Sequence, residues 1–455
     1  MTRPLSSPAA PRRALLWTLA AFFLALAVGS NGGRYSSLGM LWLSLSIGAA
    51  LFAFVAPTML PDSRRALNVV LSVAATIFAA LWLQPSGAVQ FAASLFACAL
   101  VAALVARLGR FPLPGRVLFP IFLALNAVVG VSTIAKAHHF EQTSPLLPFR
   151  VRNDVQIFAQ EAARLLTEGK NPYSARMPNV MGADLPFYWA GATGTDGTLA
   201  FGYPYLPLSL FFSLPGFWLG DFRFAHVFAL LGAAWFLAYA RPSSTSKLAA
   251  TLFLLFPSTS FVLLMSWTEP VALFFLGATL FCTFRAPRWL FLALGGLIAS
   301  KQYTIFLLPL LPLVMPEKEK WRPLFWQSLG VAALLTLPLA LWDGAGFGRS
   351  ALEMQFKQPF RTDSLSYLVT VLQFGGPQLS PLFGFAALGA VLVWALKKAP
   401  RGACTWCGAG ALAFLGFFAL NKQAFANYYF WVFGLLAASV AVALPASQSD
   451  VEKED

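Results

Sequence analysis

The sequence predicts an all-α polytopic membrane protein, and three observations support this fold class. Of the 455 residues, 58% are hydrophobic and only 11% are charged, whereas a soluble domain has about 25% charged residues. The mean hydropathy is +0.68. The apolar runs are too long for an outer-membrane barrel and do not alternate. This composition excludes a soluble enzyme, a disordered chain and a nucleic-acid-binding module, despite the net charge of +14.

Five apolar runs precede the first long polar segment. They cover residues 14–28, 38–55, 66–83, 89–106 and 117–134. The first run has the shape of a signal peptide, but we expect an uncleaved helix because many spans follow. Basic residues gather on the cytoplasmic side of membrane proteins. Arg64 and Arg65 follow the second run and Arg107, Arg110 and Arg116 follow the fourth, so the N-terminus is expected inside.

Residues 136–202 form a long polar segment, which we expect to be an ordered extracytoplasmic loop. Within it, residues 155–166 carry an apolar stripe and an opposite polar face. This pattern is typical of an amphipathic helix in the membrane interface. Asp154 is expected at the N-cap of this helix, and Gly169 and Asn171-Pro172 end it. A helix cap is the simpler role of Asp154, and a catalytic role is the alternative.

Three later segments, 203–219, 289–314 and 364–374, leave the number of crossings open. The positive-inside rule favours a segment 203–219 that lies in the membrane interface. It also favours a bend near Lys301 within 289–314 and a segment 364–374 that lies flat on the membrane. The basic residues of the later loops then all face the cytoplasm. Further spans are predicted at 222–240, 248–265, 271–284, 289–300, 303–315, 324–342, 379–396, 405–420 and 425–443. The prediction is about fourteen crossings, with both termini cytoplasmic and a disordered tail at 446–455.

With this topology, several polar residues converge on the outer face. Glu269 lies at the end of one predicted helix, and Lys301 lies between two short ones. Ionisable residues at membrane depth are rare and often functional, and a structural ion pair or interfacial snorkelling is the alternative for these two. A polar and aromatic cluster at 421–429 marks another outer junction, where an interfacial belt is the alternative.

Metal and nucleotide chemistry receive no support from the sequence. Cys404 and Cys407 form a single C-x-x-C pair without further ligands, and His138 and His139 have no partner at metal-ligand spacing. No nucleotide-phosphate loop is present. We therefore predict no cofactor and no obligate metal, and leave a non-obligate metal open.

The order of the outer-face motifs resembles the GT-C superfamily of integral-membrane glycosyltransferases. The chain is most similar to bacterial polyprenyl-phosphate-mannose-dependent mannosyltransferases, over roughly residues 117–443. The matching motifs are Asn153-Asp154, Gly169-Lys170-Asn171-Pro172-Tyr173, Phe201-Gly202-Tyr203-Pro204-Tyr205-Leu206-Pro207, Thr268-Glu269-Pro270, Ser300-Lys301-Gln302 and Asn421-Lys422-Gln423 before Asn427-Tyr428-Tyr429. The resemblance implies a GT-C-like helical bundle.

The resemblance also implies a domain organisation. Residues 1–113 would be accessory transmembrane helices, and residues 114–445 the catalytic core. The core would include the loop 136–202 and a juxtamembrane helix at 203–219. This chain departs from the superfamily in having about four extra helices before the core, Tyr203-Pro204-Tyr205 in place of Tyr-Pro-Pro, and Asn153 where some branches have an acid. These departures leave the sugar and the acceptor open.

The implied reaction moves mannose or a similar hexose or pentose from a polyprenyl phosphate to an extracytoplasmic lipid or glycan, with inversion. Asp154 would be the catalytic base, kept ionised by the helix N-terminus. Lys301 is the preferred cation for the donor phosphate, with Arg152 and Lys422 as substitutes. The predicted substrate-binding residues are Glu269, Gln302, Tyr203, Asn421, Gln423, Tyr428 and Tyr429. The location would be the inner (plasma) membrane, with the site on the outer face.

Two other classes stay open. A secondary transporter or flippase would have related halves and a midplane site, and the short helices around Lys301 are its best support. A lipid-linked polysaccharide ligase or polymerase would use a similar donor. Its large outer loop is expected late in the chain.

Overall fold

The computed structural model describes residues 10–55, 64–82, 115–143, 153–182, 187–315 and 317–444. Over these residues the structure is helical, with three isolated β-bridges and no strand. Five of these helices are long and apolar enough to cross a membrane. They are α1 (Ala10–Gly29), α2 (Ser37–Val55), α5 (Gly115–Thr143), α8 (Arg223–Ala240) and α14 (Lys318–Trp342). These features agree with an all-α membrane protein; the GT-C architecture and the number of crossings stay predictions.

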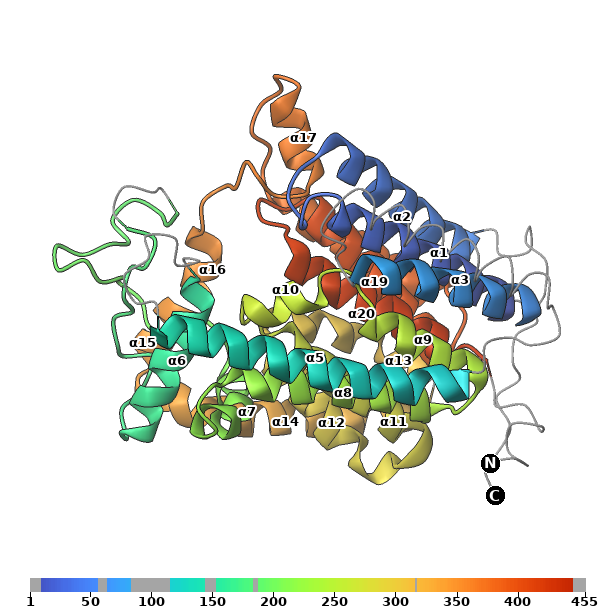
Figure 1. Ribbon diagram of the computed structural model, residues 1–455, viewed down its shortest axis with the longest axis horizontal. Helices are drawn as coiled ribbons and strands as arrows, with labels where there is room; N and C mark the ends of the chain where they lie inside the picture. The colour runs from blue at the N-terminus through green and yellow to red at the C-terminus, as the bar shows by residue number, and fades with distance from the viewer. Residues whose placement is uncertain are drawn as a thin grey trace.

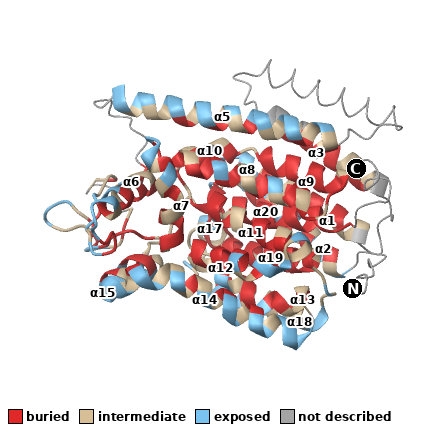
Figure 2. Ribbon diagram, turned by 90° about the horizontal axis from the view of Figure 1, so that it is seen from below, coloured by how far each residue is buried: buried red, intermediate tan, exposed pale blue. Residues whose placement is uncertain are grey.

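Helix α20 (Ala426–Ala441) lies in the core of the bundle, and nearly all its residues are buried. It packs against α1, α9 (Ser244–Leu254), α11 (Glu269–Arg285) and α19 (Ala403–Ala419). Figure 2 shows this buried middle, with exposed residues on α5, α14 and α18 (Leu382–Lys398). Many exposed side chains of the outer helices are apolar, such as Val128, Leu334 and Leu341. Helices that are apolar on all sides are typical of membrane bundles.

The N-terminal helices are part of this bundle. Helix α1 packs against α2, α3 (Arg64–Trp82) and α20. Trp17 of α1 is fully buried, and a Cβ at Gly408 of α19 would lie 2.4 Å from its ring. The absence of a side chain at Gly408 therefore lets α1 approach α19 closely. The predicted span 89–106, the domain boundary at 113 and the tail 446–455 lie outside the described residues.

The helical chain is interrupted at two places in this part of the bundle, and the sequence predicted one of them. The single helix predicted over 248–265 is wrong, because the chain forms α9 and then α10 (Thr259–Leu264). Pro257 lies between them, and a proline lacks the N–H donor and disfavours helical backbone at the preceding residue. The predicted break at Lys301 is confirmed. Helix α12 (Leu290–Ser300) ends there, and Lys301 is extended, with φ −156° and ψ 147°.

The chain after Lys301 continues as short elements. They are η3, a 3-10 helix (Gln302–Leu310), and α13 (Leu311–Val314). Thr304 donates a hydrogen bond to the carbonyl of Leu297 at 2.7 Å, and η3 packs against α12. These contacts hold the chain against the helix that it has just left.

The loop predicted at 136–202 begins later than expected, because α5 continues to Thr143. Its amphipathic helix is α6 (Asp154–Thr167), and the predicted juxtamembrane helix is α7 (Pro207–Trp218). Phe158, Tyr173, Met177 and other loop residues form a second hydrophobic cluster, separate from the bundle core. This cluster explains why the described part of the loop is ordered.

Short helices complete this region. They are α15 (Gly344–Phe347), the π-helix η4 (Gly348–Glu353) and α16 (Met354–Lys357). Together with α6, α15 and α16 lie at one end of the bundle, on the left in Figure 1. Helix α17 (Tyr367–Gln373) has seven residues, about 10 Å in length. It is too short to cross a membrane core of about 30 Å.

The close approach of α18 to α19 gives a stability prediction. A Cβ at Gly384 would lie 2.6 Å from the carbonyl oxygen of Phe417, whereas Gly389 on the same helix has nothing within 4 Å. Gly384→Ala should therefore destabilise the protein by about 1–3 kcal/mol. Gly389→Ala should be neutral or stabilising, because alanine is the better helix former. Thermal unfolding in detergent measures both, and equal melting temperatures would contradict the packing.

Candidate functional site

Asp154 is the first residue of α6. The N-cap predicted for it belongs to Asn153, whose side-chain oxygen accepts from the amide of Gln156 at 3.2 Å. Asp154 Oδ1 accepts from the amide of Val155 at 2.9 Å, and Oδ2 accepts from the hydroxyl of Tyr188 at 3.0 Å. Because Asn153 caps the helix, the carboxylate of Asp154 is free to meet the loop residue Tyr188.

Burial raises the pKa of Asp154 above its ordinary value. The hydrogen bonds from Tyr188 and Val155 and the charge of Arg361 lower the pKa, but less. The backbone amides at the start of α6 lower the pKa of Asp154, as expected of a helix N-terminus, but burial raises this pKa by more. A carboxylate with a raised pKa is a better proton acceptor once it is ionised.

Glu269 and Lys301 form a buried ion pair. Glu269 Oε1 accepts from Lys301 Nζ at 2.5 Å, from Asn427 at 2.9 Å and from the Tyr303 hydroxyl at 3.2 Å. The two charged side chains are 0% and 6% exposed. The ammonium also lies 5.3 Å from the ring centre of Tyr205 and 5.6 Å from that of Tyr303. The charge of Lys301 is thus already compensated by the structural ion pair that the sequence left open as an alternative.

Two tyrosines lie within electrostatic range of both Glu269 and Asp154. Desolvation raises the pKa of Tyr205, and the charges of Asp154 and Glu269 raise it further. Tyr428 lies within electrostatic range of Glu269, Arg361 and Asp154. The carboxylate of α6 and the buried pair therefore share one region of the molecule.

Arg361 is the cation of this region that the sequence analysis missed. Its Nε and Nη2 each donate to the carboxylate of Asp363 at 3.0 Å. The guanidinium lies 4.6 Å from the ring centre of Phe187 and 5.1 Å from that of Phe425. Within the described part of the chain, its Nη1 makes no hydrogen bond. The available signal was the charge pair Arg361-Thr362-Asp363 directly before the segment 364–374.

The other predicted phosphate cations are placed differently. Lys422 Nζ donates to the carbonyls of Phe356 at 2.7 Å and Gln358 at 2.5 Å. Gln423 donates to the carbonyl of Pro359 at 3.1 Å, and the carbonyl of Lys422 accepts from the amide of Arg361 at 3.0 Å. These contacts hold the segment that leads to Arg361. Arg152 lies outside the described residues.

The remaining predicted substrate-binding residues mainly contact the protein itself. Gln302 donates to the carbonyls of Pro204 and Ala351. Tyr203 and Tyr429 are buried, with hydroxyls bonded to Ser209 Oγ at 3.0 Å and to the Leu365 carbonyl at 2.5 Å. Asn421 accepts from the amide of Lys422 at 2.8 Å. Among these predicted residues, Tyr428 is the one that shares the electrostatic environment of both carboxylates.

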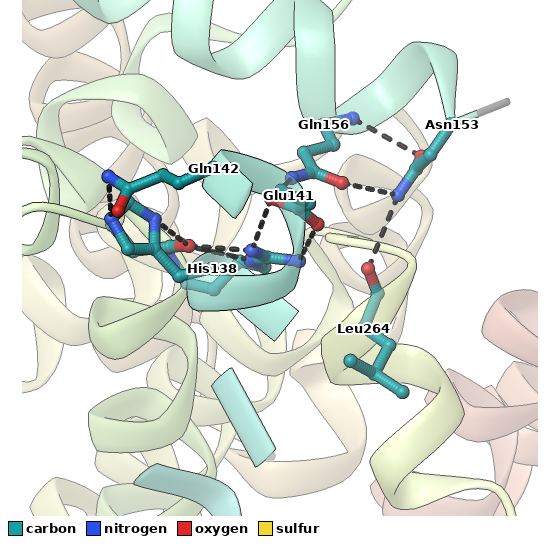
Figure 3. Close-up of polar contacts among 8 residues, drawn as sticks. His138, Glu141, Gln142, Asn153, Gln156 and Leu264 are labelled. Atoms are coloured by element: carbon teal, nitrogen blue, oxygen red, sulfur yellow. Dashed lines mark hydrogen bonds and ion pairs between the residues drawn. The ribbon is translucent and has the colours of Figure 1, made fainter. Parts of the chain in front are cut away.

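A polar network fixes the first turn of α6 (Figure 3). Gln156 donates to Glu141 at 2.8 Å, and Asn153 donates to the Leu264 carbonyl at 3.2 Å. The guanidinium of Arg223, which is 1% exposed, donates to both Glu141 and Asp221 at 2.6 to 3.2 Å. The network joins α5, α6, α8 and α10, and it therefore determines where Asp154 lies.

The same network contains one group of potential metal ligands. His138, Glu141 and Asp221 offer ligand atoms that lie within 4.8 Å of one another. Arg223 already donates to both carboxylates, and a metal ion would have to displace this guanidinium. The group is therefore better described as the anchor of a buried arginine.

The comparisons with known proteins add no identification. No protein-family model, curated protein or solved structure matches the chain. The candidate site combines a carboxylate able to accept a proton with a guanidinium whose Nη1 has no hydrogen bond within the described residues, beside buried tyrosines.

The buried ion pair gives the second prediction. Lys301→Met leaves Glu269 buried without its counter-charge and should cost about 3–5 kcal/mol in stability. The double variant Glu269→Gln/Lys301→Met should recover much of that loss, because no unpaired charge is then left in the interior. Thermal unfolding of both singles and the double in detergent measures the coupling. Lys320→Met, which breaks an exposed pair with Glu317, is the control and should change little; additive losses in the cycle would contradict the pairing.

Proposed function

We propose that this protein is an integral-membrane glycosyltransferase. Its reaction moves a sugar, mannose or a similar hexose or pentose, from a polyprenyl phosphate to a lipid or glycan acceptor. The observation that supports this proposal most directly is the arrangement of Asp154, Tyr188 and Arg361. A partly buried carboxylate with a raised pKa lies within electrostatic range of a guanidinium whose Nη1 makes no hydrogen bond to a described residue. The resemblance of the outer-face motifs to GT-C enzymes supports the choice of donor.

The proposed chemistry is a single displacement. An acceptor hydroxyl attacks the anomeric carbon, and Asp154 takes the hydroxyl proton as the new carbon–oxygen bond forms. The bond between the anomeric carbon and the phosphate oxygen breaks, and its electron pair leaves with the polyprenyl phosphate. Attack from the face opposite the leaving group inverts the anomeric configuration.

Arg361 is the proposed partner of the leaving phosphate. A guanidinium stabilises the negative charge that grows on phosphate oxygens. Lys301 is less suited to this role, because Glu269 neutralises it at 2.5 Å. Phe187 and Phe425 flank the guanidinium and limit its contact with water, which strengthens such an interaction.

The proposed donor is a membrane lipid, and the apolar helices of the protein are consistent with such a substrate. Five helices long and apolar enough to cross a bilayer fit a substrate whose polyprenyl tail stays in lipid. In this proposal, residues 114–445 form the catalytic core and residues 1–113 an accessory helical unit. The core would lie in the plasma membrane with Asp154 on the extracytoplasmic face and both termini in the cytoplasm.

Replacement of the proposed base tests the reaction. Asp154→Asn should lower sugar transfer at least about 100-fold, because an amide cannot accept the proton. Transfer of labelled sugar from a polyprenyl-phosphate donor to membrane acceptors is the measurement. Asp196→Asn is the matched control, since Asp196 is an exposed acid of the same loop. Undiminished turnover in Asp154→Asn would contradict the proposal.

The product also separates the other classes. Movement of a solute or lipid across vesicles without a covalent product would indicate a transporter or flippase. Transfer of a whole glycan chain would indicate a ligase or polymerase. Addition of single sugars supports the proposal.

The pH dependence of transfer gives a further prediction. The reaction needs ionised Asp154, so the rate should fall as the pH drops through the raised pKa of this residue. The Tyr188 hydroxyl favours the ionised form, and Tyr188→Phe should move the acidic limb of kcat/KM to higher pH by about one unit. Tyr239→Phe on α8, whose ring packs against Phe119 and Trp235, should leave the limb in place. A limb at the same pH in Tyr188→Phe would contradict the assignment.

A further inference from the structure

We infer that the turn between α1 and α2 positions Arg361, and that the N-terminal helices are thereby part of the candidate site. The backbone amide of Tyr35 donates to the carbonyl of Asp363 at 2.9 Å. An isolated antiparallel bridge joins Arg34 to Ser364. Backbone hydrogen bonding therefore holds the α1–α2 turn beside the segment that follows Arg361. The inference rests on the proposed function in one respect, namely that the ligand of Arg361 is the donor phosphate.

Asp363 contacts both the turn and the guanidinium of Arg361. Its carbonyl accepts from Tyr35, and its carboxylate accepts from Arg361 Nε and Nη2 at 3.0 Å each. A two-point contact of this kind fixes the plane of the guanidinium as well as its position. Arg34 Nε adds a long contact of 4.0 Å to the same carboxylate. Displacement of Asp363 would thus displace Arg361.

The turn between α1 and α2 packs directly against the start of α20. Gly33 has φ +75°, and a Cβ there would lie 2.4 Å from the backbone nitrogen of Ala426, at the start of α20. Asn31 closes the turn by donating to the Tyr35 carbonyl at 2.9 Å. The absence of a side chain at Gly33 is what lets the turn rest against α20. The position of the turn therefore depends on this one glycine.

A second contact lies further along both segments. Ser44 Oγ of α2 and the hydroxyl of Tyr367 at the start of α17 are 2.7 Å apart. In Figure 1 one end of the blue helix α2 lies near the orange helix α17. The segment that carries Arg361 is thus held by the N-terminal helices at two points, Asp363 and Tyr367. A pre-ordered guanidinium binds an anion with a smaller loss of conformational entropy.

Two neighbouring glycines provide the test. Gly32 has φ +60° and nothing within 4 Å of a Cβ, so Gly32→Ala carries a similar backbone strain without the collision at Ala426. In Gly33→Ala the turn must move away from α20. Both full-length variants place alanine at a positive φ, so a difference between them reports the lost contact of the turn with α20.

The first measurement does not require any enzymatic activity. Hydrogen exchange of residues 358–367 and the rate at which phenylglyoxal modifies Arg361 are followed by mass spectrometry in detergent. Gly33→Ala should accelerate both at least about fivefold, and Gly32→Ala should match the wild type. Equal rates in Gly33→Ala and the wild type would overturn the inference.

The second measurement uses sugar transfer. Gly33→Ala should raise the KM for the polyprenyl-phosphate donor about tenfold and also lower kcat, because Arg361 is proposed to contact the donor phosphate both before and during its departure. A merely structural loss would lower the amount of active protein and leave KM unchanged, and that result would overturn the inference. If the wild type shows no transfer but Gly33→Ala exposes Arg361, the proposed function fails and the positioning role stands.

If Gly33→Ala does not fold, Asp363→Ala tests the same contact between the turn and Arg361. It leaves the turn and its contact with Ala426 intact but removes both hydrogen bonds to the guanidinium. The expected result is faster phenylglyoxal modification of Arg361 and a raised donor KM, with unchanged hydrogen exchange in residues 31–36. Unchanged reactivity of Arg361 and unchanged KM would overturn the inference.

Discussion

The ion pair between Glu269 and Lys301 connects four parts of the bundle. Glu269 begins α11, Lys301 occupies the break after α12, and Tyr303 and Asn427 bring η3 and α20 to the same carboxylate oxygen. Transfer of a lone charge into an apolar interior costs several kcal/mol. The chain can bury these two charges only together. The position of the break at Lys301 is thereby tied to the start of α11.

The same constraint explains where chemistry is possible. Arg223 is matched by Asp221 and Glu141, and Arg361 by Asp363. Asp154 differs, because its direct partners are a tyrosine hydroxyl and a backbone amide. Burial raises the pKa of Asp154, and these neutral hydrogen-bond donors offset only part of the rise. Among the described residues, the lack of a direct cationic partner thus distinguishes Asp154 from the carboxylates of the structural ion pairs.

The site is assembled from segments that are distant in the sequence. The loop after α5 supplies Asp154 and Tyr188, and the chain before α17 supplies Arg361. The α1–α2 turn contacts the latter segment through Asp363. Such long-range contacts leave no periodic pattern in the sequence. The sequence therefore does not indicate Arg361, whereas the position of Lys301 between two helices is visible in it.

The sequence by itself determined the class of fold, the amphipathic helix α6 and the break at Lys301. Hydropathy, the polar face of residues 155–166 and a lone lysine within an apolar run are local properties, and they act within one or two helical turns. Only the tertiary structure decided that Lys301 is neutralised by Glu269, that Asn153 rather than Asp154 caps α6, and that Arg361 lies near Asp154. These outcomes depend on which charges share a buried volume, and helix packing determines that volume.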